Sequence, residues 1–214
     1  MLRYKLLKNH GGITLIGDYD SLNVLHEIVH DVNKRSPIIR NKEGSFLGLA
    51  YDVRKAFERQ REIYEPPKFE PEVGVMYGVQ ILWPVLLVQH RMLRQSLAFI
   101  DSTKKHQAIT YALEWVIENA LEDDFGLNAP AIKEQWNRID TTDSYPEKHL
   151  ISRGGLFSSW SKAQRAKLTA NLLASLDSMY VINYKIRSKH GDSELISPDL
   201  LEDWEGRDWP DPKV

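Results

Sequence analysis

The sequence predicts a mainly α protein of the α+β class, a helical domain of about five to six helices with a small N-terminal β-hairpin. Three observations predict this class. Apolar residues recur at helical spacing in several segments, most clearly over residues 109–121. Two β-prone segments near the N-terminus flank a pair of glycines. The most apolar run, residues 81–88, is too short to cross a bilayer, which needs about 20 apolar residues, so we expect a buried helix there.

The N-terminal segment is expected to form the hairpin and a first helix. The β-prone segments are residues 4–7 and 13–16, and the Gly-Gly pair at 11–12 allows the positive φ angles of a tight turn. The Asp-Ser pair at 20–21 would cap a helix whose apolar residues recur at helical spacing. The Ser-Pro pair at 36–37 should end this helix, because the residue before proline avoids α-helical backbone.

A second helix is expected over residues 46–63, and a proline-rich connector at 65–71 should follow it. Residues 73–83 fit two interpretations, because alternate positions are apolar, as in a strand, while a helical spacing also fits. The glycines in this segment would each cost a helix about 1 kcal/mol, and Pro84 suits the first turn of a new helix. We therefore favour one further strand at residues 73–82, followed by a helix.

The C-terminal half is expected to be helical, with one long loop. A helix capped by the Asp-Ser pair at 101–102 should end near Gly126, and a short helix is expected at 129–138. Residues 139–157 show no apolar period and include two adjacent glycines, which predicts a loop. A long helix is then expected over residues 159–189.

Charge divides the chain into two parts. We expect a single mostly helical domain over residues 1–191 and an acidic, tryptophan-containing tail over residues 192–214. The tail holds eight acidic and two basic side chains, a net charge of −6, so the total of −2 leaves +4 on the domain. A Ser-Pro pair at 197–198 predicts a short helix inside the tail.

Composition limits the chemistry and the location. There is no Cys, which excludes disulfides, thiolate metal sites and a Cys nucleophile. The first residues contain no uninterrupted apolar stretch of signal-peptide length, so we expect a soluble, cytoplasmic protein that does not enter a membrane.

One motif has the spacing of a zinc site. His26 and His30 enclose Glu27 in an H-E-x-x-H pattern on a predicted helix, where residues i and i+4 share a face and can hold one Zn²⁺. Glu27 would then be the general base, so one hypothesis is a zinc-dependent metallohydrolase. A third ligand is also needed, and the candidates by residue type are Glu118, Glu122 and His106. We favour the alternative that the histidines are structural and that no cofactor is required.

Basic residues predict weaker alternatives. Lys162 and Arg165 lie near the start of a predicted helix, where free N–H groups attract anions, but a local capping box also explains that segment. The basic residues at 54–61, together with those at 162–167, would suit a nucleic-acid surface. Acidic residues interrupt the first group, so a solvated helix face is the favoured interpretation.

The tail contains candidate partner-binding residues. Leu200, Trp204 and Trp209 lie in an acidic context, and tryptophan is a frequent anchor in protein interfaces. The competing interpretation, which we favour, is that this segment packs back on the chain's own domain.

Two segments, residues 44–58 and 77–89, resemble a bacterial family of unknown function. The resemblance implies a single soluble domain and carries no activity or site residues. Our first hypothesis is therefore a non-catalytic interaction or accessory protein that binds a protein partner or forms a homo-oligomer. The zinc-dependent hydrolase is the alternative, and nucleic-acid binding is the weaker alternative.

Overall fold

A four-stranded antiparallel sheet organises the N-terminal half of the chain. The computed structural model describes residues 1–66, 68–69, 74–190 and 195–214. In spatial order the strands are β1 (Arg3–Leu6), β2 (Gly12–Gly17), β4 (Met76–Leu82) and β3 (Glu62–Tyr64). β1 and β2 form the predicted hairpin, and β4 confirms the further strand from residue 76 onward. Val73, where that strand was expected to begin, lies outside the described residues.

The turn of the hairpin requires unusual backbone angles. Asn9 and His10 have positive φ angles of 57° and 53°, and Gly12 has a φ of 151°. A Cβ atom on Gly12 would overlap the carbonyl oxygen of Ile81 on the neighbouring strand. Glycine is therefore needed here for the pairing of β2 with β4 as well as for the turn.

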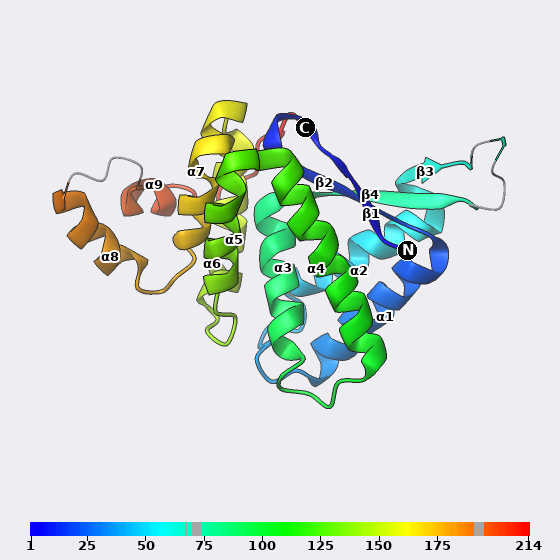
Figure 1. Ribbon diagram of the computed structural model, residues 1–214. Helices are drawn as coiled ribbons and strands as arrows, with labels where there is room; N and C mark the ends of the chain where they lie inside the picture. Colours follow the sequence, from blue (N-terminus) through cyan, green and yellow to red (C-terminus); the bar gives the residue numbers. More distant parts are fainter. Residues whose placement is uncertain (67, 70–73, 191–194) are drawn as a thin grey trace.

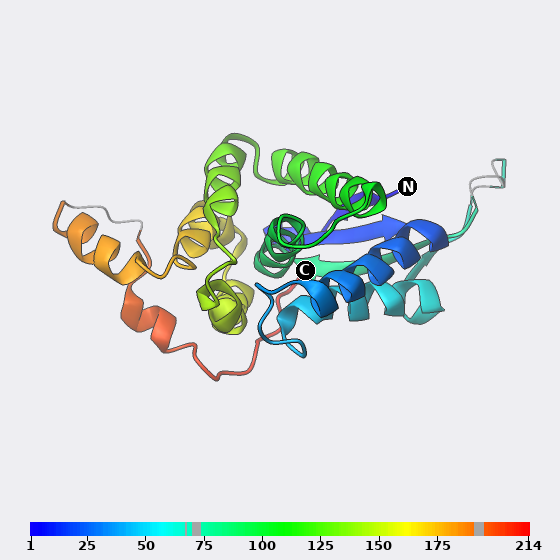
Figure 2. The ribbon, with the colours of Figure 1, turned by 90° about the horizontal axis from the view of Figure 1, so that it is seen from below.

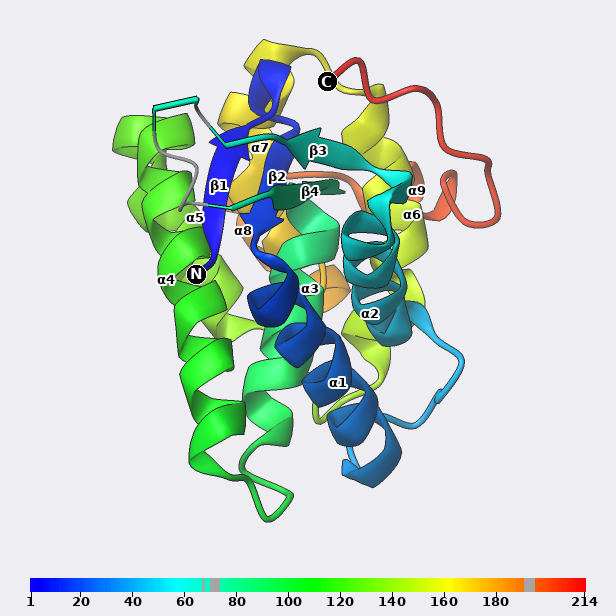
Figure 3. The same ribbon diagram turned by 90° about the vertical axis from the view of Figure 1, so that its right-hand side faces the viewer.

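Three helices pack on the sheet, and a fourth runs beside β1 (Figure 3). These helices are α1 (Tyr19–Arg35), α2 (Ser45–Lys55), α3 (Trp83–Ser96) and α4 (Lys104–Phe125). Strand residues in the core form register pairs, with Ile13 opposite Ile81 and Leu15 opposite Val79, and all four are buried. The apolar run at 81–88 spans the end of β4 and the start of α3, and Pro84 lies in the first turn of α3 as predicted.

Two helix starts differ from the predicted caps. The side chain of Asp18, which precedes the predicted 20–21 pair, accepts the Ser21 N–H at 2.7 Å and caps α1. Thr103 caps α4, because its hydroxyl accepts the His106 N–H in a reciprocal capping box. The predicted end of the first helix at Ser36 is confirmed.

The C-terminal half adds a second group of helices on the far side of α3 (Figures 1 and 2). They are α5 (Ala129–Arg138), α6 (Tyr145–Ser159), α7 (Lys162–Ala174), α8 (Tyr180–Arg187) and α9 (Pro198–Glu202). α6 packs against α3, α5 packs against α7, and α8 and α9 lie furthest from the sheet. The mainly α class with a small sheet is thus confirmed. No helix in the described ranges is long and apolar enough to cross a membrane.

Three boundary predictions are wrong. Most of residues 139–157 belong to α6 rather than to a loop. The helix expected over 159–189 stops at Ala174, and the Asp177 carboxylate accepts the Met179 N–H at 2.8 Å where the chain turns into α8. The helix expected over 46–63 ends as α2 at Lys55; a π-helical turn with Arg59 at a φ of 64° then redirects the chain into β3.

The tail returns across the helices to the hairpin turn (Figure 1). We call residues 195–214 the strap. It leaves the region of α8, passes α6 and ends beside the N-terminal turn, where the Asn9 side-chain amide donates a hydrogen bond to the Lys213 carbonyl at 2.8 Å. The first residues of the predicted tail, 192–194, lie outside the described residues, as does Gly191, the expected end of the long helix.

Candidate functional site

The two histidines of the H-E-x-x-H motif lie side by side on α1. The ring centroids of His26 and His30 are 4.5 Å apart, and the ring of His26 also meets the edge of Phe57. Burial, and then the positive charge that His30 can carry, lower the pKa of His26. The lowered pKa favours the neutral form of His26, which is the form that binds a metal ion.

The remaining predicted residues of the zinc site face elsewhere. Glu27 is exposed and pairs with Lys105 of α4 at 3.2 Å, and this contact lowers the pKa of the Glu27 carboxyl. His106 Nε2 lies 2.9 Å from the Asp31 carboxylate. Across the described residues, no group of three or more His, Asp or Glu side chains is arranged to hold a metal ion. The structure thus brings the predicted ligands His26 and His30 together, while the predicted base Glu27 is paired with Lys105. Zinc binding stays a prediction.

Trp204 and Trp209 pack on two glycines of α6. A Cβ atom on Gly154 would overlap the ring of Trp209, and one on Gly155 would lie 3.0 Å from the ring of Trp204. The adjacent glycines thus give α6 a flat surface that receives both rings. Leu200, the third predicted partner-binding residue, is 41% exposed.

One carboxylate of the strap is held by α6. Glu205 Oε1 lies 2.8 Å from His149 Nδ1, and it accepts hydrogen bonds from Ser152 Oγ at 2.8 Å and from the Arg153 guanidinium at 3.2 Å. Burial raises the pKa of Glu205, but these contacts outweigh burial and lower the pKa below its ordinary value. Arg153 is 3% exposed, so Glu205 balances a buried positive charge.

Arg165, predicted to bind anions with Lys162, is 1% exposed and joins three parts of the chain. Its guanidinium donates to the carbonyl oxygens of Phe157 (3.1 Å), Ser158 (3.1 Å), Asn9 (3.2 Å) and Pro212 (2.5 Å). These acceptors belong to the end of α6, the hairpin turn and the strap. Lys162 is exposed at the start of α7.

The basic residues of the nucleic-acid hypothesis lie near acidic ones. The exposed ion pairs at the end of α2 are Arg54–Glu58 (3.7 Å), Arg59–Glu65 (3.7 Å) and Arg61–Asp52 (3.9 Å). Exposed pairs at these distances contribute little to stability and leave the cations accessible. Nucleic-acid binding stays a prediction.

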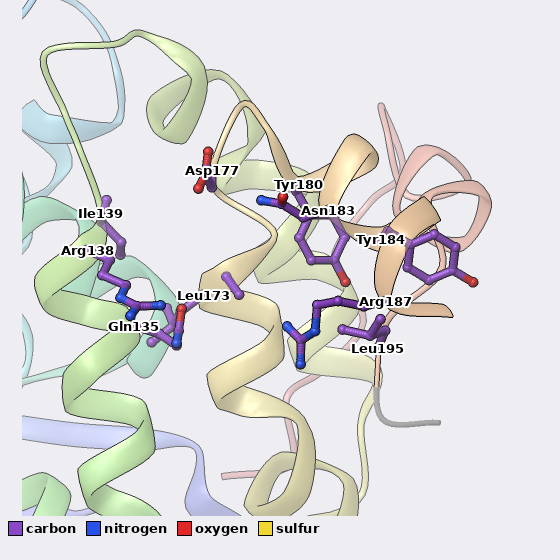
Figure 4. Close-up of a pocket in the computed structure, with 11 residues that line it drawn as sticks. Gln135, Arg138, Ile139, Leu173, Asp177, Tyr180, Asn183, Tyr184, Arg187 and Leu195 are labelled. Atoms are coloured by element: carbon purple, nitrogen blue, oxygen red, sulfur yellow. The ribbon is translucent and has the colours of Figure 1, made fainter. Parts of the chain in front are cut away.

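A small polar cavity of about 130 Å³ lies between α5, α7 and α8 (Figure 4). α5 contributes Gln135 and Arg138, and α8 contributes Asn183 and Arg187. Beside it, the Tyr180 hydroxyl donates to the Ile196 carbonyl at 2.8 Å and accepts the Ile196 N–H at 3.1 Å. The cavity therefore lies at the interface through which α8 and the strap pack on the other helices.

The outer face of α4 carries an exposed aromatic pair that the sequence analysis did not single out. Tyr111 and Trp115 are 49% and 53% exposed, and Figures 2 and 3 show α4 on the outside of the molecule. The exposed residues that share this face are Lys104, Ala108, Tyr111, Trp115, Glu118 and Glu122. Their spacing alternates between four and three residues, as in the contact stripe of a coiled coil. We call these six residues the α4 stripe.

The charges of the α4 stripe oppose the helix dipole. Lys104 lies in the first turn, near the partly positive N-terminus, while Glu118 and Glu122 lie toward the partly negative C-terminus. This arrangement costs the isolated helix a few tenths of a kcal/mol per charge. The signal that could have identified the face is an aromatic pair on the polar side of the clearest amphipathic helix in the sequence.

An open hollow of about 650 Å³ lies between the loop before α2 and the first turns of α6. Its lining residues are Arg40, Asn41, Glu43, Gly44, Ser45, Ser144, Glu147, Lys148 and Ile151. Burial raises the pKa of the Glu147 carboxyl, against the opposing effect of the Lys42 charge. Glu147 Oε1 and Ser45 Oγ are buried there without a hydrogen-bond partner among the described residues.

Comparison with known proteins identifies a family and no relative of known role. No curated protein and no solved structure matches the chain. A family model described as a domain of unknown function (DUF6904) matches residues 2–181, which include the sheet and helices α1 to α7 but not the strap. The chain therefore belongs to the DUF6904 family.

Proposed function

We propose that the protein is a non-catalytic interaction protein that self-associates through the α4 stripe. The observation that carries the proposal is the exposed pair Tyr111 and Trp115 at the centre of a helix whose charges oppose its own dipole. Large aromatic side chains at a surface are typical anchors of interfaces. A second copy of the chain is the partner that explains the charges as well as the aromatic residues.

The charges of the α4 stripe are self-complementary when two copies pair antiparallel. In sequence, Lys104 and Glu122 are equidistant from the midpoint of Tyr111 and Trp115. A two-fold axis at that midpoint sets Lys104 opposite the partner's Glu122 and Tyr111 opposite the partner's Trp115. Every such contact occurs twice, because a two-fold interface repeats each pair.

The size of α4 suits this contact. Its 22 residues span about 33 Å, and aromatic residues occupy the middle of that length, where interface anchors are concentrated. Phe99, which is 49% exposed, precedes α4 by five residues in the sequence. The antiparallel arrangement also places each N-terminal Lys104 near a carboxylate, which removes the unfavourable interaction with the dipole.

Sedimentation equilibrium tests the proposal. The full chain should be dimeric at about 100 µM. Trp115→Ala should raise the dissociation constant of the dimer roughly 1000-fold, because each of the two copies of Trp115 in the interface loses about 2 kcal/mol of binding free energy. Tyr51→Ala is the matched control, because Tyr51 is 50% exposed on α2, away from the stripe. A wild-type chain that stays monomeric, or a Tyr51→Ala effect equal to that of Trp115→Ala, would refute the proposal.

A charge swap tests the antiparallel register. Lys104→Glu and Glu122→Lys should each weaken the dimer, and the double variant should restore it, because both charges then reverse together. Glu122 also pairs with Lys133 at 2.6 Å, but this contact is exposed and contributes at most about 1 kcal/mol to the monomer. Failure of the double variant to recover would exclude this register.

Zinc binding by His26 and His30 is the second candidate, favoured by their adjacent rings and by the lowered pKa of His26. Hydrolysis would further require Glu27 to leave Lys105. Protein purified without a His-tag should then contain about one equivalent of zinc, and His26→Ala should lose it. Unchanged zinc content in His26→Ala would end this candidate.

A further inference from the structure

Four charged side chains line the hollow between α2 and α6. Arg40 and Lys148 supply two positive charges, and Glu43 and Glu147 supply two negative charges. Among the described residues, none of these four side chains forms a hydrogen bond or an ion pair. The hollow therefore contains cationic and anionic side chains that form no ion pairs with one another.

Buried oxygen atoms beside the hollow point to a ligand as well. Within the part of the chain that the structure describes, Ser45 Oγ and Glu147 Oε1 are buried without hydrogen-bond partners, and such atoms are rare because each costs about 1–3 kcal/mol. Beneath Ser45, the Gln89 amide donates to the Ser45 carbonyl at 2.7 Å while its own oxygen is also unpaired. A ligand with hydrogen-bond donors would satisfy the oxygen atoms that line the hollow.

The start of α2 adds an anion-binding element. The residue at its N-cap is Gly44, which has no side chain to accept a hydrogen bond from the first-turn N–H groups. The Leu47 N–H donates to the Gly44 carbonyl at 3.2 Å, and Glu147 Oε1 lies against Gly44. The other first-turn N–H groups favour a carboxylate or a phosphate. A phosphate would leave the charges of Glu43 and Glu147 unbalanced, whereas a carboxylate accompanied by an ammonium group would not.

We propose that this hollow binds a small zwitterion, an α-amino acid with an apolar side chain. The carboxylate of the ligand lies at the start of α2 beside Arg40, and its ammonium group lies at Glu147. Ile151, which is 53% exposed in the wall of the hollow, contacts the apolar side chain. The volume of about 650 Å³ lies within the range of small-molecule sites.

Calorimetric titration of the full chain tests the ligand class. The probes are L-leucine, 4-methylpentanoate, which lacks the ammonium group, and 3-methylbutylamine, which lacks the carboxylate. L-leucine should bind, and each analogue should bind at least about tenfold more weakly, because it leaves one charged group of the hollow unpaired. Equal affinities for the three probes, or no binding of L-leucine at about 10 mM, would overturn the proposal.

Variants of the hollow test its location. Glu147→Gln and Arg40→Gln should each weaken L-leucine binding about tenfold, and Gly44→Ala should abolish it, because the added methyl group overlaps the Glu147 carboxylate. Glu134→Gln on α5 is the control, with an exposed carboxylate outside the hollow. Circular dichroism verifies that each variant is folded. An equal effect of Glu134→Gln, or full binding by folded Gly44→Ala, would place the ligand elsewhere and overturn the proposal.

Discussion

Replacing Gly154 with alanine should destabilise this protein, although the same change in an ordinary helix stabilises it by about 1 kcal/mol. The reason is the ring of Trp209, which occupies the position that the new methyl group needs. Trp209 is 36% exposed, so roughly two thirds of its surface is buried against α6. For a buried tryptophan area of about 100–170 Å², burial contributes about 3 kcal/mol, as an upper estimate.

The net effect of Gly154→Ala follows from these two contributions. Displacing Trp209 loses about 3 kcal/mol, and the improved helix propensity returns about 1 kcal/mol, so the free energy of unfolding should fall by about 2 kcal/mol. In a chain that already carries Trp209→Ala, nothing is displaced, and the same change should raise the free energy of unfolding by about 1 kcal/mol. The sign of the effect therefore depends on the strap.

Urea unfolding followed by circular dichroism at 222 nm measures all four chains of this double-mutant cycle. Backbone ellipticity is preferable to fluorescence, because the chain contains six tryptophans. The expected coupling energy between the two positions is about 3 kcal/mol. If Gly154→Ala stabilised both backgrounds equally, Trp209 would not rest on Gly154 in solution, and the docked strap would be refuted.

Three further predictions concern the buried side chains of His90 and Arg165 and the exposed carboxylate of Glu205. Burial, and then the Arg91 charge, lower the pKa of His90 to about 3, so its contribution to stability is complete above pH 6.5 and is lost as the pH falls toward 3. His90→Met should therefore remove a slope of about 1.4 kcal/mol per pH unit from the unfolding free energy measured between these values. Arg165→Met should cost about 2–4 kcal/mol in urea unfolding, because buried carbonyl oxygens lose their donor, whereas Lys162→Met should change stability by less than about 0.5 kcal/mol. The lowered pKa of Glu205 means that its contribution is present above its ordinary value of 4.5 and is lost as the pH falls through the lowered value. The indole N–H resonances of Trp204 and Trp209 should accordingly shift on acidification, and the absence of that shift in Glu205→Gln would identify the responsible group.

Elements with strong local signals were predictable from the sequence. The hairpin, β4 and α3 follow from the glycine pair, from alternating apolar residues and from Pro84 at the start of a helix. The long apolar period of α4 and the glycine that ends it also correspond to the structure. In each case the residues that determine the element lie within it.

The errors arise where distant residues determine the local structure. Gly154 and Gly155 weaken the helical signal of α6, and the tryptophans that cover them are about fifty residues away in the sequence. β3 contains only three residues and forms because it pairs with β4. The hollow at the start of α2 likewise combines residues 40–45 with residues 144–151, which no local pattern connects.

The contact between the hairpin turn and the strap affects how the protein folds during translation. The carbonyl of Asn9 shares the Arg165 guanidinium with that of Pro212, and the Asn9 side-chain amide donates to the Lys213 carbonyl. A turn made among the first residues to leave the ribosome therefore completes its contacts with the strap only when residues 212–213 have emerged. Contacts so distant in sequence slow folding, because a long stretch of chain must be ordered before they form. A nascent chain stalled before the strap would therefore hold its N-terminal hairpin in a less ordered state.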